Sequence, residues 1–189
     1  MLADASRRRK GRLSFTDRVA VAIYDFLERR SGRLLDAHLC VTHALKPSLL
    51  HKYGIHAQAA HDRPPSMFTS LSENERLAAL ARISTIAFPS SSNDPFWRGR
   101  SLADASKDRP TLVASSTSWS ADEDFDVLLD ALIAYDKSNT RRLVVIVTGK
   151  GELRRRFEER YATLHLQNVR VATAWLSTRD YCCLLACAD

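Results

Sequence analysis

Two short polar loops carry the side chains best suited to chemistry in this chain of 189 residues. The first loop contains Ser115, Ser116, Thr117 and Ser118, whose hydroxyl groups and backbone amides can donate hydrogen bonds. The second loop is Gly149-Lys150-Gly151, in which the glycines permit close backbone approach and the lysine supplies a cation. Donors of these kinds could together hold a diphosphate group between the two loops.

The same residues also have a purely structural interpretation, which is favoured when they are taken alone. Serine-rich loops often form turns and helix caps, and a glycine pair often makes a tight connection from strand to helix. The Gly-Lys-Gly run lacks the G-x-x-x-x-G-K-[ST] pattern of a P-loop. Acidic residues at 122–124 also oppose an anion at the start of the next helix, so Lys150 or the loop itself would have to hold a phosphate.

The loops follow apolar segments that the hydrophobic periodicity predicts to be strands of a parallel α/β sheet. Strands are expected at residues 112–114, 143–147 and 169–172, alternating with helices at 122–136, 152–163 and 178–188. Parallel strands bring their carboxyl ends to one edge of the sheet, where open α/β sheets bind nucleotides. Trp175 follows the third strand and can face the same edge, although an aromatic residue there is more often part of the core.

The earlier part of the chain contains a second, shorter pattern of strands and helices. Helices are predicted from Thr16-Asp17 to about Arg30, from Pro47 to Gly54 and from Glu73 to about Ile83, with short strands at 37–41 and 55–60. Residues 84–110 combine turn residues with scattered charges, a composition typical of a linker. We therefore expect a first domain at 1–83, a linker at 84–110 and a second domain at 111–189.

Charge and cysteine content narrow the functional classes. Of the net charge of +6, residues 1–33 contribute +5, from nine Lys or Arg and four Asp or Glu. This basic start could bind an anionic membrane surface or an acidic protein, but a solvated face of a helix is the simpler interpretation. Nucleic acid is disfavoured, because no basic stripe with interleaved aromatic residues follows Arg7 to Arg12. No apolar run approaches the roughly 18 residues that span a bilayer.

The four cysteines, Cys40, Cys182, Cys183 and Cys187, have no C-x-x-C spacing and no neighbouring histidines that would form a metal site. They are predicted to be reduced, as in a protein that faces the cytosol. His38 and His43 flank the predicted strand of the first domain, but a structural role is favoured over that of a catalytic base. The residues alone therefore identify neither a catalytic group nor a metal centre.

Several longer runs carry a resemblance to a known family. They are Ser115-Ser-Thr-Ser-Trp-Ser-Ala-Asp-Glu-Asp-Phe125, Thr148-Gly-Lys-Gly151, Ala174-Trp-Leu176 with Asp180-Tyr181, His38-Leu-Cys-Val-Thr42, and Asp62-Arg-Pro-Pro-Ser-Met-Phe68. Their order and content resemble the chitobiosyldiphosphodolichol beta-mannosyltransferase family of GT-B glycosyltransferases. The resemblance covers about residues 18–68 and 109–189.

The resemblance implies a GT-B-like fold, with the end of an N-terminal Rossmann-like domain on the acceptor side and the first half of a C-terminal Rossmann-like domain on the donor side. It implies β-1,4-mannosyl transfer, with inversion, from GDP-mannose to chitobiose linked to dolichol diphosphate, in assembly of the lipid-linked oligosaccharide for protein N-glycosylation. Candidate donor-binding residues are then Ser116, Thr117, Ser118, Trp119, Gly149, Lys150, Gly151 and Trp175. It implies no cofactor besides the donor substrate, and it leaves the catalytic base and any metal requirement unassigned.

The resemblance also implies the cytosolic face of the endoplasmic reticulum membrane as location, with that membrane surface and other transferases of the pathway as partners. Members of the family carry an N-terminal membrane anchor, an early glycine-rich turn and a downstream segment for the sugar and ribose, none of which is recognised here. The chain is therefore expected to be incomplete and inactive alone. Two alternatives stay open: another GT-B nucleotide-sugar transferase, or a non-catalytic module that binds a membrane or a protein.

Overall fold

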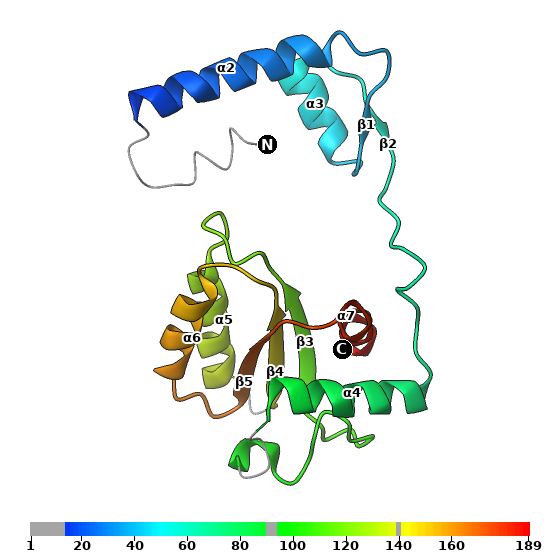
Figure 1. Ribbon diagram of the computed structural model, residues 1–189, viewed down its shortest axis with the longest axis vertical. Helices are drawn as coiled ribbons and strands as arrows, with labels where there is room; N and C mark the ends of the chain where they lie inside the picture. Colours follow the sequence, from blue (N-terminus) through cyan, green and yellow to red (C-terminus); the bar gives the residue numbers. More distant parts are fainter. Residues whose placement is uncertain (1–13, 90–93, 139–140) are drawn as a thin grey trace. The chain divides into compact units, whose positions relative to one another are not determined.

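The computed structural model describes residues 14–89, 94–138 and 141–189, and the chain divides into two compact units, Met1–Pro64 and Pro65–Asp189. Each unit is described by itself (Figure 1). Both combine helices with parallel strands, which confirms the predicted α/β class. The basic stretch from Arg7 to Arg12 lies outside the described residues.

The first unit contains two helices and a pair of very short strands. Its elements are α2 (Phe15–Gly32), β1 (Leu39–Cys40), α3 (Leu45–Tyr53) and β2 (Gln58–Ala59). The strands pair in parallel, with Leu39 opposite Gln58. The first helix begins at Phe15, just before the predicted start at Thr16-Asp17, because Ser14 and Asp17 form a capping box in which the Ser14 amide donates to the Asp17 carboxylate at 3.2 Å. Gly54 ends α3 in the left-handed conformation, at φ +68°.

The second unit is built on a three-stranded parallel sheet in the order β3-β4-β5. Its elements in chain order are α4 (Glu73–Ala87), η2 (Pro95–Trp97), β3 (Thr111–Ser116), α5 (Phe125–Ser138), β4 (Leu143–Thr148), α6 (Arg154–Ala162), β5 (Val169–Ala174) and α7 (Thr178–Cys187). The strands start in register, since Leu143 lies opposite both Thr111 and Val169. All six residues of the central strand β4 are buried, as expected for a sheet covered on both faces.

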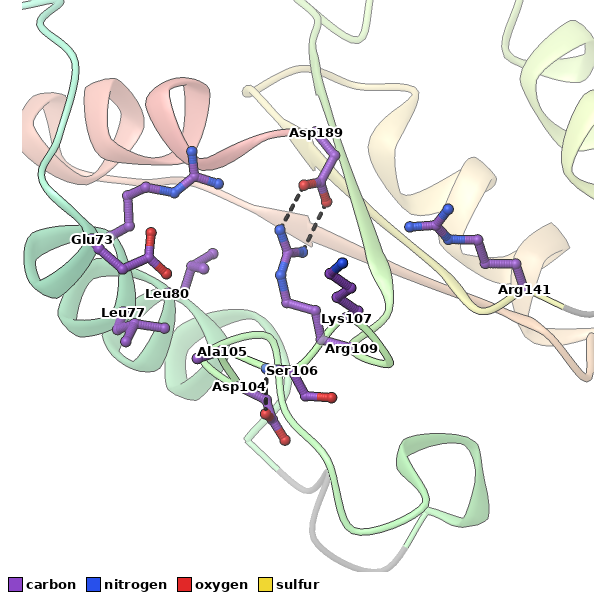
Figure 2. Close-up of a pocket in the computed structure, with 11 residues that line it drawn as sticks. Glu73, Leu77, Leu80, Asp104, Ala105, Ser106, Lys107, Arg109, Arg141 and Asp189 are labelled. Carbon is purple, nitrogen blue, oxygen red and sulfur yellow. Dashed lines mark hydrogen bonds and ion pairs between the residues drawn. The ribbon is translucent and has the colours of Figure 1, made fainter.

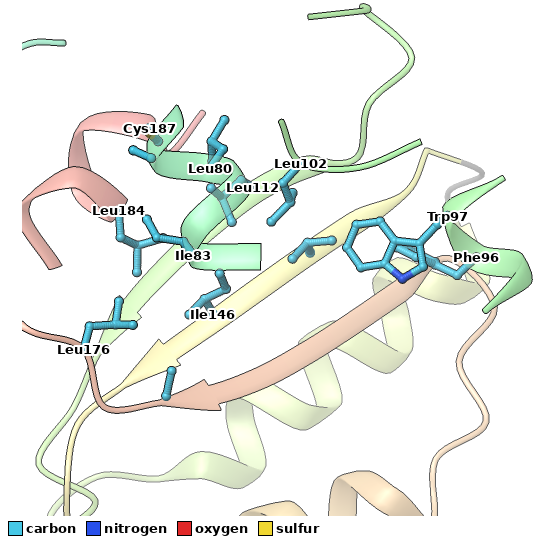
Figure 3. Close-up of a cluster of buried hydrophobic side chains, with 13 residues drawn as sticks. Leu80, Ile83, Phe96, Trp97, Leu102, Leu112, Ile146, Leu176, Leu184 and Cys187 are labelled. Atoms are coloured by element: carbon cyan, nitrogen blue, oxygen red, sulfur yellow. The ribbon is translucent and has the colours of Figure 1, made fainter. Parts of the chain in front are cut away.

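Helices cover the two faces of this sheet (Figure 1). On one face, α5 and α6 pack through Leu129, Leu132 and Phe157 against the side chains of Val145 and Val147. The other face carries α4 and α7, whose Leu80, Ile83 and Leu184 pack against strand residues that include Leu112 and Ile146 (Figure 3). Both faces therefore contribute apolar cores, and the sheet edge at the carboxyl ends of the strands is rigidly supported.

Part of the segment predicted as a linker packs into the core of the second unit. Phe96 and Trp97 in η2 and the following Leu102 are buried in the same cluster as Leu80 and Ile146 (Figure 3). The rings of Phe96 and Trp97 meet edge to face, with centroids 5.2 Å apart. Residues 94–110 thus close one end of the sheet. The division of this chain into a first domain at 1–83, a linker at 84–110 and a second domain at 111–189 stays a prediction.

An ion pair fixes the start of this segment to the sheet. Asp94 accepts hydrogen bonds of 2.6 and 2.8 Å from the guanidinium group of Arg170 on β5, and one of 2.9 Å from the amide of Phe96. The bonds from Arg170 lower the pKa of the Asp94 carboxyl, and burial opposes them without cancelling them. The folded pKa is therefore below the unfolded value of about 3.9.

Replacing Asp94 by asparagine is expected to reduce the free energy of unfolding at pH 7 by about 1–2 kcal/mol. Because the folded pKa of Asp94 is depressed, its stabilisation is present above about pH 4 and is lost as the pH falls through the folded value. Urea unfolding of wild type and D94N at pH 7 and at lower pH measures this difference, which should narrow on acidification. The exposed Asp130→Asn on α5 is the matched control. An equal loss at every pH would contradict the assignment to ionised Asp94.

Candidate functional site

The loops that follow β3, β4 and β5 meet at one edge of the sheet, as the sequence predicts. The amide of Thr117 donates to the carbonyl of Thr148 at 2.9 Å, and the amide of Gly149 donates to that of Ala174 at 3.3 Å. The amide of Leu153, at the start of α6, donates to the carbonyl of Trp119 at 3.1 Å. Backbone hydrogen bonds therefore hold the two predicted site loops directly against each other.

The glycines of the second loop are required by this close contact. Gly149 has φ +142°, and a Cβ atom there would lie 1.8 Å from the carbonyl oxygen of Thr117. At Gly151, a Cβ atom would lie 2.1 Å from the carbonyl oxygen of Ser118. No space remains for a diphosphate between the backbones at these positions, so a ligand would lie over the outer side of the loops.

Two hydroxyl groups of the first loop form hydrogen bonds with the carboxylate of Glu123. Thr117 donates a very short hydrogen bond to it, Ser118 donates at 3.2 Å, and the amide of Ser120 donates at 3.4 Å. Burial raises the pKa of Glu123, but these hydrogen bonds outweigh it and lower the pKa overall. The carboxylate is thus ionised at neutral pH and organises the loop, which leaves the protons of Thr117 and Ser118 engaged within it.

Trp119 lies beneath the loops as a core residue. Its side chain is fully buried and stacks on Phe125, with ring centroids 4.6 Å apart, and it also contacts Phe157 at 5.1 Å. Its backbone has φ +52°, a conformation supported by a 3.0 Å hydrogen bond from its amide to the hydroxyl of Thr117. Trp119 can therefore shape a donor site by positioning the loop, whereas its ring is not accessible to a ligand.

Four of the candidate side chains are exposed near the carboxyl ends of the strands: Ser116, Ser118, Lys150 and Trp175. The ammonium group of Lys150 lies 4.2 Å from the centre of the Trp175 ring, and the ring is 59% exposed. Ser116, at the end of β3, is also exposed, and its hydroxyl lies 2.9 Å from that of Tyr181 on α7. This edge therefore presents a cation, an aromatic ring and paired hydroxyl groups, a combination suited to a phosphate and the ring of an attached group.

Tyr181 was not among the candidate site residues. Ser177 caps α7 by accepting a 3.1 Å hydrogen bond from the amide of Asp180, which places Tyr181 in the first turn of the helix. This capping spacing is visible in the sequence, but which side chain the tyrosine would reach depends on how α7 packs on the sheet. The hydroxyl pair with Ser116 is consequently a finding of the structure.

Within the described ranges, no group of three or more His, Cys, Asp or Glu residues could hold a metal ion. All four cysteines are free thiols. The ring of His43 packs edge to face against that of His61, with centroids 5.0 Å apart, and His38 bonds to the carbonyl of Gly32. Among the residues that the structure describes, no helix is both long and apolar enough to cross a bilayer.

Comparisons with known proteins extend the resemblance across both units. The chain is 34% identical to the human chitobiosyldiphosphodolichol beta-mannosyltransferase, an alignment that covers 89% of this chain and 40% of that protein. It is 36% identical to the protein of the same name from Arthroderma benhamiae, in an alignment that covers 89% of this chain and 38% of that protein. It is also 30% identical to the UDP-glycosyltransferase TURAN of Arabidopsis thaliana, in an alignment that covers 89% of this chain and 44% of that protein.

No family model matches the chain, and no solved structure matches it. The chain spans about two fifths of the length of the curated relatives that it matches, at 40% and 38% of the two mannosyltransferases. The family resemblance predicted from the sequence is thus confirmed: over 89% of its length, this chain is similar to chitobiosyldiphosphodolichol beta-mannosyltransferases.

Proposed function

We propose that this chain is part of a GT-B transferase that moves mannose from GDP-mannose to chitobiose linked to dolichol diphosphate, forming a β-1,4 bond. The observation that carries the proposal is 34% identity to a protein named for this acceptor, along 89% of the chain. The parallel sheet with loops at its carboxyl ends supports a nucleotide-sugar site. A dolichol-linked acceptor would place the reaction at the endoplasmic reticulum membrane, and we propose its cytosolic face.

The exposed residues at the strand ends have the chemistry that the donor diphosphate requires. When the sugar is transferred, negative charge develops on the departing nucleoside diphosphate, and a fixed cation stabilises that charge. Lys150 supplies a cation held over Trp175, and Ser116 supplies a hydroxyl from the neighbouring strand end. Thr117, Ser118 and the two glycines would hold the loops in place, with Trp119 as their support.

The closest alternative is a transferase that uses another nucleotide sugar. One relative, at 30% identity, is named a UDP-glycosyltransferase, so the base of the donor nucleotide is the property to test. A ligand that binds only the folded state raises the apparent stability, by about 2.7 kcal/mol at one hundred times its dissociation constant. Thermal unfolding with added nucleotides therefore separates the two candidates.

We expect GDP to raise the melting temperature of the chain more than UDP does at equal concentration. Replacing Lys150 by glutamine should weaken GDP binding about tenfold, because a charge-assisted contact to phosphate is lost. Lys137→Gln, in the last turn of α5, makes the same charge change away from this edge and is the control. Equal stabilisation by UDP would favour the alternative transferase. A GDP effect that K150Q leaves unchanged would contradict the assignment of Lys150.

A further inference from the structure

A strongly basic groove of about 600 Å³ lies at the opposite edge of the sheet in the second unit. Six cationic side chains line it together with the acidic Asp108: Arg98, Arg100, Lys107, Arg109, Arg141 and Arg142. Arg109 and Arg142 come shortly before β3 and β4, so the groove is at the amino ends of the strands. A strand of six residues is about 17 Å long, which separates the groove from the candidate donor edge.

Most of these cations are not neutralised by neighbouring carboxylates. Arg109 pairs with Asp189 at 2.6 Å (Figure 2). Arg100 pairs with Asp104 at 3.1 Å. Arg98, Lys107 and Arg141 form no ion pair with any carboxylate of the described residues. Lys107 and Arg109 come from the segment before β3 and Arg141 from the segment before β4, so the groove gathers charge from separate parts of the chain. These three side chains also line the adjoining pocket drawn in Figure 2.

Arg142 forms a buried part of the groove wall. Its residue is only 9% exposed, and its guanidinium group donates to the carbonyl oxygens of Phe96 at 3.1 Å and Trp97 at 2.6 Å, and to that of Asp108. Burial lowers the pKa of Arg142, and the nearby Arg98 lowers it further. Because arginine stays protonated in proteins, this charge is retained. An anion in the groove would therefore offset the electrostatic cost of burying the Arg142 charge beside other cations.

We propose that this groove binds a ligand that carries two or more phosphate groups. Arginine guanidinium groups present paired N–H donors that match phosphate oxygens, and several of them around one concavity favour a polyanion over a single charge. Carbonyl oxygens occupy donors of Arg142, so the exposed Arg98, Lys107 and Arg141 would make the direct contacts. The site is separate from the donor edge, and the proposal does not depend on the proposed function.

Titration of the full chain with sodium pyrophosphate, followed by calorimetry at about 0.15 M ionic strength, tests the proposal. We expect saturable binding that weakens at least about tenfold in the double variant R98Q/R141Q. The double variant R155Q/R156Q on α6 carries the same change in net charge, and Arg155 forms an exposed ion pair with Glu159. This control should bind pyrophosphate within about twofold of the wild type. Thermal unfolding checks that both variants are folded.

Vesicles of phosphatidylcholine with and without a phosphatidylinositol bisphosphate distinguish the two sources of such phosphates. Co-sedimentation that pyrophosphate displaces and that R98Q/R141Q loses would identify a lipid headgroup, whereas binding of pyrophosphate alone would identify a soluble ligand. Either result supports the groove. Equal weakening in both double variants would show attraction by net charge only and would overturn the proposal. Absence of saturable binding by the wild type up to about 10 mM pyrophosphate would overturn it as well.

Discussion

Replacing Gly149 by alanine is expected to lower the free energy of unfolding by about 3 kcal/mol or more. Two independent penalties act at this position. The backbone has φ +142°, which side chains of L-amino acids rarely adopt. The new Cβ atom would also lie 1.8 Å from the carbonyl oxygen of Thr117, so the two site loops would have to separate. Urea unfolding of wild type and variant measures the loss.

Gly99 provides the matched control for this substitution. It has φ +70°, but no atom lies within 4 Å of the position that its Cβ would occupy. Alanine there should cost only the backbone penalty of about 1–2 kcal/mol. A larger loss at Gly149 than at Gly99 would demonstrate the contact between the loops. Equal losses would contradict it, because conformational preference alone would then account for both.

The order of elements in the second unit could be predicted because each strand and helix has a clear local pattern. The apolar run from Leu143 to Val147 is too short for an ordinary helix and is bounded by polar residues, and it forms the buried central strand β4. The capping pairs at Ser72 with Glu75 and Ser177 with Asp180 are formed as the spacing predicts. Local signals of this kind do not depend on tertiary contacts, which is why they were reliable.

The packing of residues 94–110 could not be predicted for the opposite reason. Turn residues and charges dominate the segment, and its apolar members Phe96, Trp97 and Leu102 show no helical or strand period. Their burial depends on the open end of the sheet that they cover and on the ion pair from Asp94 to Arg170. These contacts join residues that are far apart in the sequence, so composition alone indicated a linker.

The candidate site shows the same division between local and tertiary information. The sequence places both polar loops at the carboxyl ends of parallel strands, and the structure brings them into contact. The sequence does not indicate which hydroxyl groups of the loops face a ligand. Glu123, one of the acidic residues at the start of the predicted helix, accepts hydrogen bonds from Thr117 and Ser118, and this depends on the path of the loop between them. Their roles in binding donor substrate stay predictions.

Trp119 is the side chain whose removal should most affect the support of these loops. Replacing it by alanine is expected to cost about 3–5 kcal/mol, because a fully buried aromatic ring and its contacts with Phe125 and Phe157 are lost. Phenylalanine at the same position should cost much less. The indole nitrogen is buried without a hydrogen-bond partner among the described residues, so its loss removes no such bond.

Trp175→Ala provides the comparison for Trp119, because Trp175 is an exposed ring that can contact a ligand and Trp119 is a buried ring that supports the loops. Its ring is 59% exposed and holds Lys150 by a cation–π contact, so alanine there should change the free energy of unfolding by less than about 1 kcal/mol. Chemical unfolding without nucleotide measures the free energies of unfolding of W119A, W119F and W175A. If W119A is as stable as W175A, the buried position of Trp119 is wrong, and its ring would instead be available to a donor. A large loss in W119A alone, largely restored in W119F, would establish that the loops depend on an aromatic core residue beneath them.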